Sequence, residues 1–166
     1  MKITATVLAV GMMLGLSACG EAPKAPAPSE TAGVAPEAPP GVTLSDARVQ
    51  LPAVSGRPGV AYFTISQASG PPRAIAAVSV EMAGRTELHE TAKVGEAMTM
   101  RPVTSVPLES GTSVEFAPGG KHVMLFDLDP KMRFADSVEL TVSFDSGDKA
   151  SAPAKVTTVN AMEGMN

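Results

Sequence analysis

The segment Pro118-Gly119-Gly120-Lys121-His122-Val123-Met124-Leu125-Phe126-Asp127-Leu128 joins a turn signal to a run of residues that favours a β-strand. Proline and paired glycines interrupt regular structure, whereas the residues that follow are largely apolar. Successive side chains of a strand point to opposite faces, so His122 and Met124 would share one face, with apolar side chains on the other. This segment therefore predicts a strand that presents an imidazole beside a thioether.

Short runs of the same character recur through the chain, separated by turn residues. About seven to nine such strands at this spacing are typical of an antiparallel sandwich or barrel, and no long stretch has a sustained helical period. The sequence therefore predicts an all-β domain. We expect its strands at Thr43–Leu51, Val60–Gln67, Ile75–Met82, Thr86–Thr91, Ala97–Val103, Thr112–Phe116, His122–Leu128, Ser137–Phe144 and Lys155–Val159, with turn signals that include Ala83-Gly84.

Composition limits the classes of partner. The chain has 166 residues, of which 44% are hydrophobic, and its net charge is −4. These values suit one domain of about 120 residues with a buried core. There is no basic block, and five phenylalanines and one tyrosine offer little for stacking on bases, so we do not expect nucleic acid as a partner.

The N-terminus predicts the compartment. Lys2 precedes a short apolar stretch, and Leu16-Ser17-Ala18-Cys19 resembles the lipobox of bacterial lipoproteins. We expect residues 1–18 to be a lipoprotein signal peptide and Cys19 to carry the lipid, with two or more acyl chains giving stable membrane anchoring. The alternative is an ordinary secretory signal with a chance cysteine. Cys19 is the only cysteine, which excludes a disulfide or a thiolate metal site in the folded domain.

Three further segments follow the signal peptide. We expect residues 19–41 to comprise the lipidated cysteine and a disordered Pro/Ala-rich tether, because this composition buries too little apolar surface to fold. We expect residues 42–160 to form the β-sandwich domain, which contains both histidines. Residues 161–166 would be a flexible C-terminal tail.

Both histidines of the chain lie between His89 and Met124, together with Met98 and Met100. Two residues apart on one strand, Met98 and Met100 would share a face, so either thioether could meet the imidazoles. Imidazole and thioether together suit a soft ion such as Cu(I) much better than Zn²⁺, Ca²⁺ or Mg²⁺. The sequence thus predicts a Cu(I) site in this stretch.

The alternative for each of these residues is structural. A methionine in a strand usually fills a core gap, and a histidine usually makes hydrogen bonds. We expect this packing role for Met82 and Met132. For Met162 and Met165 we expect a frayed end, and whether they assist copper binding stays open.

The spacing His89, ten residues, Met100, twenty-one residues, His122, one residue, Met124 resembles that of the periplasmic copper(I) chaperones of the PCuAC group. The resemblance implies a cupredoxin-like Greek-key β-sandwich that holds Cu(I) at a shallow, partly exposed site. It gives the ligand roles to His89, Met100, His122 and Met124. Met98 is left with two alternatives, an auxiliary ligand or a residue that packs in the core. The C-terminal tail here lacks the histidines that many members of the group carry.

The same resemblance implies a metallochaperone that delivers copper during assembly of cytochrome c oxidase, with an oxidase subunit or assembly factor as its acceptor. We expect a monomeric, membrane-anchored lipoprotein in the periplasm of a Gram-negative-type bacterium. We do not expect an enzyme, because no Ser/His/Asp signature is present, and a blue-copper carrier would need a cysteine ligand. The alternatives are a periplasmic copper buffer without a dedicated acceptor and a β-sandwich lipoprotein that binds a protein and no metal.

Overall fold

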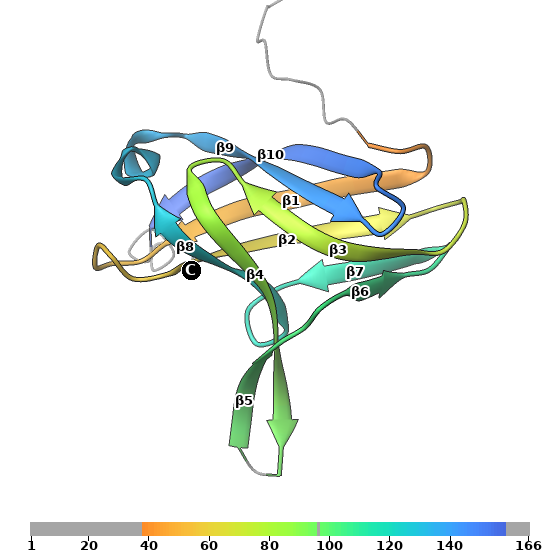
Figure 1. The fold of residues 1–166 in the computed structure, drawn as a ribbon, viewed down its shortest axis with the longest axis horizontal. Coiled ribbons are helices and arrows are strands. Elements are labelled where there is room, and N and C mark those ends of the chain that lie inside the picture. Colours follow the sequence, from red (N-terminus) through yellow and green to blue (C-terminus); the bar gives the residue numbers. More distant parts are fainter. Residues whose placement is uncertain (1–37, 96, 159–166) are drawn as a thin grey trace, which may run out of the picture. The chain divides into compact units, whose positions relative to one another are not determined.

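The structure, a computed structural model, describes residues 38–95 and 97–158. These residues form strands β1 (Val42–Leu51), β2 (Gly59–Gln67), β3 (Arg73–Val80), β4 (Ala83–Val94), β5 (Ala97–Pro102), β6 (Val106–Leu108), β7 (Thr112–Phe116), β8 (Lys121–Leu128), β9 (Ser137–Phe144) and β10 (Lys149–Thr158), with a 3-10 helix η1 (Pro130–Phe134) (Figure 1). The expected signal peptide, Cys19 and the 161–166 tail lie outside the described residues. In the described part, no helix is long and apolar enough to cross a bilayer.

The strands pair in the order β5-β4-β8-β7-β2-β1-β10-β9-β3-β6, with a further pairing between β8 and β2. This continuous sheet folds over, so that its two halves enclose one core (Figure 1). The predicted all-β, cupredoxin-like sandwich is therefore confirmed. Most pairings are antiparallel as expected, but the sheet is mixed, because β1 runs parallel to β10 and β7 runs parallel to β8.

Alternation along the strands builds the core. On β9, Val138, Leu140, Val142 and Phe144 are buried, and the residues between them are exposed or half-buried. Phe63 and Phe116 stack on neighbouring strands with ring centroids 4.2 Å apart. Burying each large apolar side chain contributes about 1.5–3 kcal/mol, and this gain fixes which face of each strand points inward.

Two strand segments were not predicted, and each contains a proline. β6 includes Pro107, which is tolerated because β6 is the last strand of the sheet and has an unpaired edge. β10 begins at Lys149 rather than at the expected Lys155. Its Pro153 pairs with Glu139 of β9 but lies before the pairing with β1 begins, so the missing N–H leaves no partner unsatisfied on that side.

The expected turn at Ala83-Gly84 was wrong. β3 ends at Val80 and β4 begins at Ala83, and Met82 makes the turn with a φ of +66°. Gly84 has another use, since a Cβ there would lie 3.0 Å from the Cβ of Asp127 on β8. The glycine thus permits close approach of two paired strands. Met132 is fully buried and Met82 packs against the core, which confirms their packing roles.

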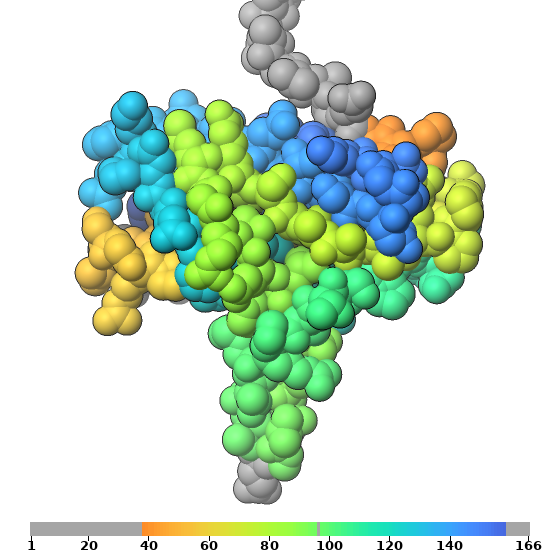
Figure 2. All heavy atoms as spheres, in the orientation of Figure 1, coloured from red at the N-terminus to blue at the C-terminus, as the bar shows by residue number. Residues whose placement is uncertain are grey.

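The β4–β5 hairpin extends beyond the sandwich as a narrow arm, drawn in green in Figure 2. All six residues of β5 are exposed, and β5 is an edge strand. The part of β4 nearer its start pairs with β8, and the part nearer its end pairs with β5, the two overlapping at His89 and Glu90. The arm therefore leaves the body of the domain beside the first residues of β8.

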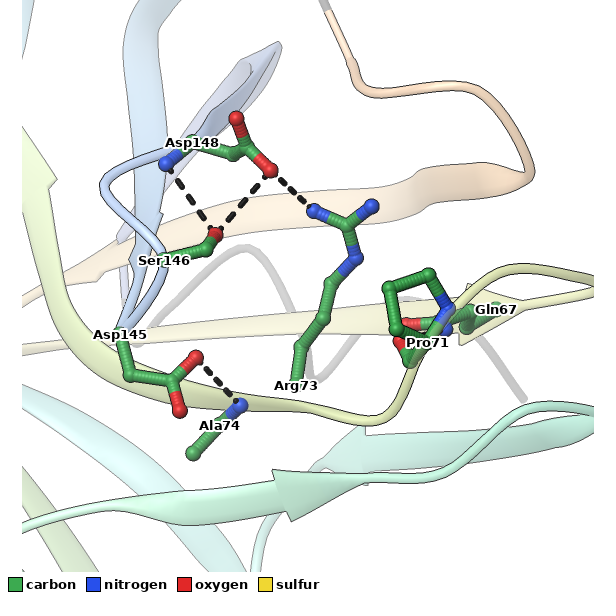
Figure 3. A network of polar contacts seen from close by, with 7 residues as sticks. All are labelled: Gln67, Pro71, Arg73, Ala74, Asp145, Ser146 and Asp148. Carbon is green, nitrogen blue, oxygen red and sulfur yellow. Dashed lines mark hydrogen bonds and ion pairs between the residues drawn. The ribbon is translucent and has the colours of Figure 1, made fainter.

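A polar network holds the β9–β10 turn against β3 (Figure 3). Asp145 accepts a 3.0 Å hydrogen bond from the backbone N–H of Ala74, and Asp148 forms an ion pair with Arg73. The Arg73 side chain is only 9% exposed and lies over the Phe144 ring, 5.5 Å from its centroid. Hydrogen bonding to Arg73, and then to Ser146, holds the pKa of Asp148 below its usual value.

Candidate metal centre

The two histidines are cross-strand neighbours. His89, in the middle of β4, pairs directly with His122, the second residue of β8. Their ring centroids are 5.9 Å apart and the rings are inclined by 33°. Val123, which follows His122, is fully buried in the core. Alternation along β8 therefore directs His122 to the other face of the sheet.

Met124 and Met100 lie on the same face as the histidines. Met124 is two residues after His122 and pairs with Glu87, which is two residues before His89. Met100, on β5, pairs with Thr91, two residues after His89. Directly paired residues and residues two apart share a face of a sheet. The register of three strands thus brings the four predicted ligands to one face.

Met98 shares that face but lies farther along the arm. It pairs with Lys93, whereas Met100 pairs with Thr91. Because a strand rises about 3.3 Å per residue, Met98 is about 7 Å farther than Met100 from the level of the histidines. Both are well exposed, Met98 at 61% and Met100 at 53%. The strand register therefore favours Met100 over Met98 as the thioether ligand. Side-chain alternation along β5 alone does not distinguish the two residues.

His122 has one ring nitrogen in use and one free. Its side chain is buried at 5% exposure, and Nδ1 lies 3.0 Å from the carbonyl oxygen of Gly120. A carbonyl can only accept, so Nδ1 carries the hydrogen and Nε2 of the neutral ring carries the lone pair. That Nε2 is buried and has no hydrogen-bond partner.

His89 has the opposite arrangement. Its Nε2 lies 3.1 Å from Oε2 of Glu87, and its Nδ1 is buried without a hydrogen-bond partner. The other carboxylate oxygen of Glu87 pairs with Arg85. The hydrogen bond with His89, followed by the charge of Arg85, lowers the pKa of Glu87. An ionised carboxylate accepts, so Nε2 donates and the lone pair of His89 lies on Nδ1.

The free nitrogens are what a metal site needs before metal binds. A buried acceptor without a partner costs about 1–3 kcal/mol, and native proteins keep few of them. Here two occur on paired histidines, on a face that also carries the thioethers of Met98, Met100 and Met124. Neutral imidazole and thioether are donors that a soft cation accepts. The donor set therefore fits a soft metal ion.

On the face of the sheet opposite the predicted ligands, three charged residues form ion pairs that link β4 to β5 and β8. Glu90 of β4 lies 3.1 Å from Arg101 of β5 and 3.1 Å from Lys121 of β8. Hydrogen bonds from Arg101 and then Lys121 lower the pKa of Glu90. Each of the three is the chain neighbour of a predicted ligand. Sequence patterns alone do not reveal this bridge or the contact between Glu87 and His89, although residues two apart on a strand, such as these, share a face.

One partly open cavity of the described domain lies away from these residues. A cavity of about 270 Å³ is bounded by the β1–β2 connection, the end of β8 and η1, and none of the predicted ligands lines it. Within residues 38–95 and 97–158, no group of three or more His, Cys, Asp or Glu side chains could hold a metal ion. The candidate centre is a surface cluster of two imidazoles and thioethers. Cys19, Met162 and Met165 fall outside the described residues.

One known family matches most of the folded domain. Residues 42–156 match the family model described as "Putative lipoprotein LpqE-like". The chain is also 31% identical over 146 residues to "Putative lipoprotein Lxx21020" of Leifsonia xyli subsp. xyli, a match that covers 87% of this chain and 83% of that protein.

Solved structures share the fold at low sequence identity. The copper-bound PCuAC domain from PmoF2 aligns with a TM-score of 0.59 at 17% identity, covering 75% of this chain and 98% of that domain. DR1885 from Deinococcus radiodurans aligns in its apo form with a TM-score of 0.56 at 23% identity, covering 87% of this chain and 97% of that one. Its CuI form has a TM-score of 0.50 at 23% identity, covering 78% and 85%. These matches show that the chain has the PCuAC fold.

Proposed function

The chain belongs to the LpqE-like lipoprotein family, and from this premise we propose that it is an extracytoplasmic metallochaperone for Cu(I). The proposed ligands are His89, Met100, His122 and Met124, with Met98 as an auxiliary ligand on the same strand face as Met100. The proposed task is delivery of copper during assembly of cytochrome c oxidase. It is a carrier and not an enzyme.

One observation carries the copper proposal. The free nitrogens of His89 and His122 are buried, lack hydrogen-bond partners and belong to rings 5.9 Å apart. Two relatives in fold support the choice of metal, since one was solved copper-bound and the other in a CuI form. Thioether sulfur stabilises the softer Cu(I) over Cu(II), and neutral ligands leave the ion with a single positive charge. Such an ion is held without the strong attraction of a thiolate site.

The exposure of the centre supports transfer. Met100 is 53% exposed on an edge strand, whereas His122 is 5% exposed against the body of the domain. A ligand of an acceptor can approach from the Met100 side while the histidines still hold the ion. Copper then moves by ligand exchange, and no free ion is released. A monomer suffices for this step.

The proposed location rests on the N-terminus and on the family. Cys19 follows a lipobox-like sequence, and the family and the Leifsonia relative are both described as lipoproteins. We therefore place the domain in the periplasm, tethered to a membrane by lipid on Cys19 through residues 19–41. Metabolic labelling with a fatty acid tests this, because Cys19→Ser would remove the label and leave unprocessed precursor. Equal labelling of the variant would contradict the anchor.

Binding is tested by anaerobic titration of residues 38–166 with Cu(I) against a chromogenic Cu(I) chelator. We expect one Cu(I) per chain, and no comparable affinity for Zn²⁺. Uptake of Zn²⁺ without binding of Cu(I) would contradict the proposal.

Delivery is tested by deleting the gene. Loss of cytochrome c oxidase activity at low copper supports delivery, whereas copper sensitivity with normal oxidase activity would indicate buffering instead.

A further inference from the structure

Glu87 lies beside the proposed centre but has no role in the four-ligand set. Its carboxylate faces two side chains of β4, with Oε2 3.1 Å from Nε2 of His89 and Oε1 paired with Arg85. Arg85, Glu87 and His89 are every second residue of β4, so their side chains lie on the same face of the strand. Arg85 in turn lies over the Phe126 ring of β8, 3.9 Å from its centroid. The position of Glu87 is thus fixed from the side opposite His89.

This contact decides which nitrogen of His89 is available. In a neutral imidazole one nitrogen carries hydrogen and the other a lone pair, and the partner of the first sets the tautomer. Because Glu87 accepts from Nε2, the lone pair of His89 lies on Nδ1, the atom that is buried without a partner. In His122 the carbonyl of Gly120 takes the hydrogen on Nδ1 and leaves Nε2 free.

We propose that Glu87 is a positioning residue that holds His89 as its Nε2–H tautomer, so that the metal is bound through Nδ1 of His89 and Nε2 of His122. This inference rests on the proposed Cu(I)-binding function. The two rings approach the ion from opposite strands and through different atoms. Replacing a residue that orients a metal-binding histidine typically lowers metal affinity by about 10- to 100-fold. Glu87 itself does not bind the ion.

The first test uses the apo protein and needs no metal. Long-range ¹H–¹⁵N correlation spectra, recorded where both rings are neutral, identify the tautomer of each histidine. We expect Nε2–H for His89 and Nδ1–H for His122. In Glu87→Ala the His89 signals should move toward a mixture of tautomers, and those of His122 should stay unchanged. An Nδ1–H form of His89 in the wild-type protein, or an unaltered tautomer in Glu87→Ala, would overturn the inference.

The second test separates positioning from direct ligation. Anaerobic competition with a Cu(I) chelator should give an affinity about 10- to 100-fold lower for Glu87→Ala. Glu87→Gln should stay within a few-fold of wild type, because its amide oxygen still accepts from Nε2–H although an amide is a poor ligand for soft metals. Equal loss in both variants would indicate that Glu87 is a ligand and overturn the positioning role. Glu115→Ala, at an exposed residue of β7, controls for the loss of one negative charge.

The Cu(I)-loaded protein gives the last readout. Cu(I) is diamagnetic, so ¹⁵N shifts should change most at Nδ1 of His89 and at Nε2 of His122. A larger change at Nε2 of His89 would overturn the inference while leaving Cu(I) binding intact. Failure of the wild-type protein to bind Cu(I) would instead remove the proposed function, and the apo tautomer would still decide the role of Glu87.

Discussion

His89 and His122 face each other across β4 and β8 with ring centroids 5.9 Å apart, and each ring keeps one buried nitrogen that has no hydrogen-bond partner. The other nitrogen of each ring is already used, by Glu87 in one case and by the carbonyl of Gly120 in the other. A pair of unused acceptors lowers stability unless something binds them. The proposed Cu(I) site gives both atoms a partner.

Replacement of His89 by alanine should lower Cu(I) affinity by more than about 100-fold, which exceeds the usual effect of losing a residue that only orients a ligand. The chelator competition described above measures it. The fold should survive, because the His89 side chain is partly exposed, at 15%. Thr91→Ala, two residues away on the same face, is the control and should bind like wild type. Wild-type affinity in His89→Ala would remove His89 from the site.

Met100 and Met98 form a matched pair, since both are exposed and share one face of β5. Leucine replaces methionine with little change in volume. Met100→Leu should weaken Cu(I) binding by about tenfold or more, corresponding to about 1.4 kcal/mol. Met98→Leu should have a smaller effect, because its strand position is farther from the histidines. The reverse order of the two effects would assign the thioether to Met98.

The bridge of Arg101, Glu90 and Lys121 should limit opening of the arm. Glu90→Gln removes the charge that both cations share, so the amides of β5 should exchange hydrogen faster, while those of β9 stay unchanged. Hydrogen exchange monitored by mass spectrometry measures this. Added salt should produce part of the same effect in the wild-type protein, because these groups are partly exposed and their attraction is screened. Unchanged exchange in β5 would show that backbone pairing alone holds the arm.

Ionisation of Asp148 should make the free energy of unfolding depend on pH in the acid range. Its pKa is lowered in the fold by Arg73, so its contribution is complete above the usual value of 3.8 and is lost as the pH falls through the lower folded pKa. Asp148→Asn leaves the mostly buried Arg73 without its anion and should lower the melting temperature at neutral pH. The gap to wild type should narrow in strong acid. Glu115→Gln is the control, and a constant gap at all pH values would contradict this account.

Strand periodicity predicted most of the fold, because one face of each strand packs into a common core. It missed β6 and the first half of β10, where Pro107 and Pro153 argue against a strand unless its edge is known to be unpaired. Edges follow from the order of strands, which alternation does not contain. For the same reason the parallel pairing of β1 with β10 was not predictable.

The candidate centre was predictable in part. Ligand chemistry pointed to the histidines with either Met98 or Met100, the resemblance to the PCuAC spacing implied the set His89, Met100, His122 and Met124, and the strand register places these four on one face. Strand alternation did not choose between Met98 and Met100, and the pairing of Met100 with Thr91, which the fold supplies, supports the choice of Met100 that the resemblance implied. The hydrogen bonds that free Nδ1 of His89 and Nε2 of His122 depend on side-chain orientation, about which a sequence says nothing.

X-ray absorption on the Cu(I)-loaded protein tests the central claim most directly. The spectrum should contain both sulfur and nitrogen neighbours of copper, and replacing His89 and His122 together should remove the nitrogen contribution. A spectrum that the double replacement leaves unchanged, or one without sulfur neighbours, would contradict a Cu(I) site built from these histidines and methionines.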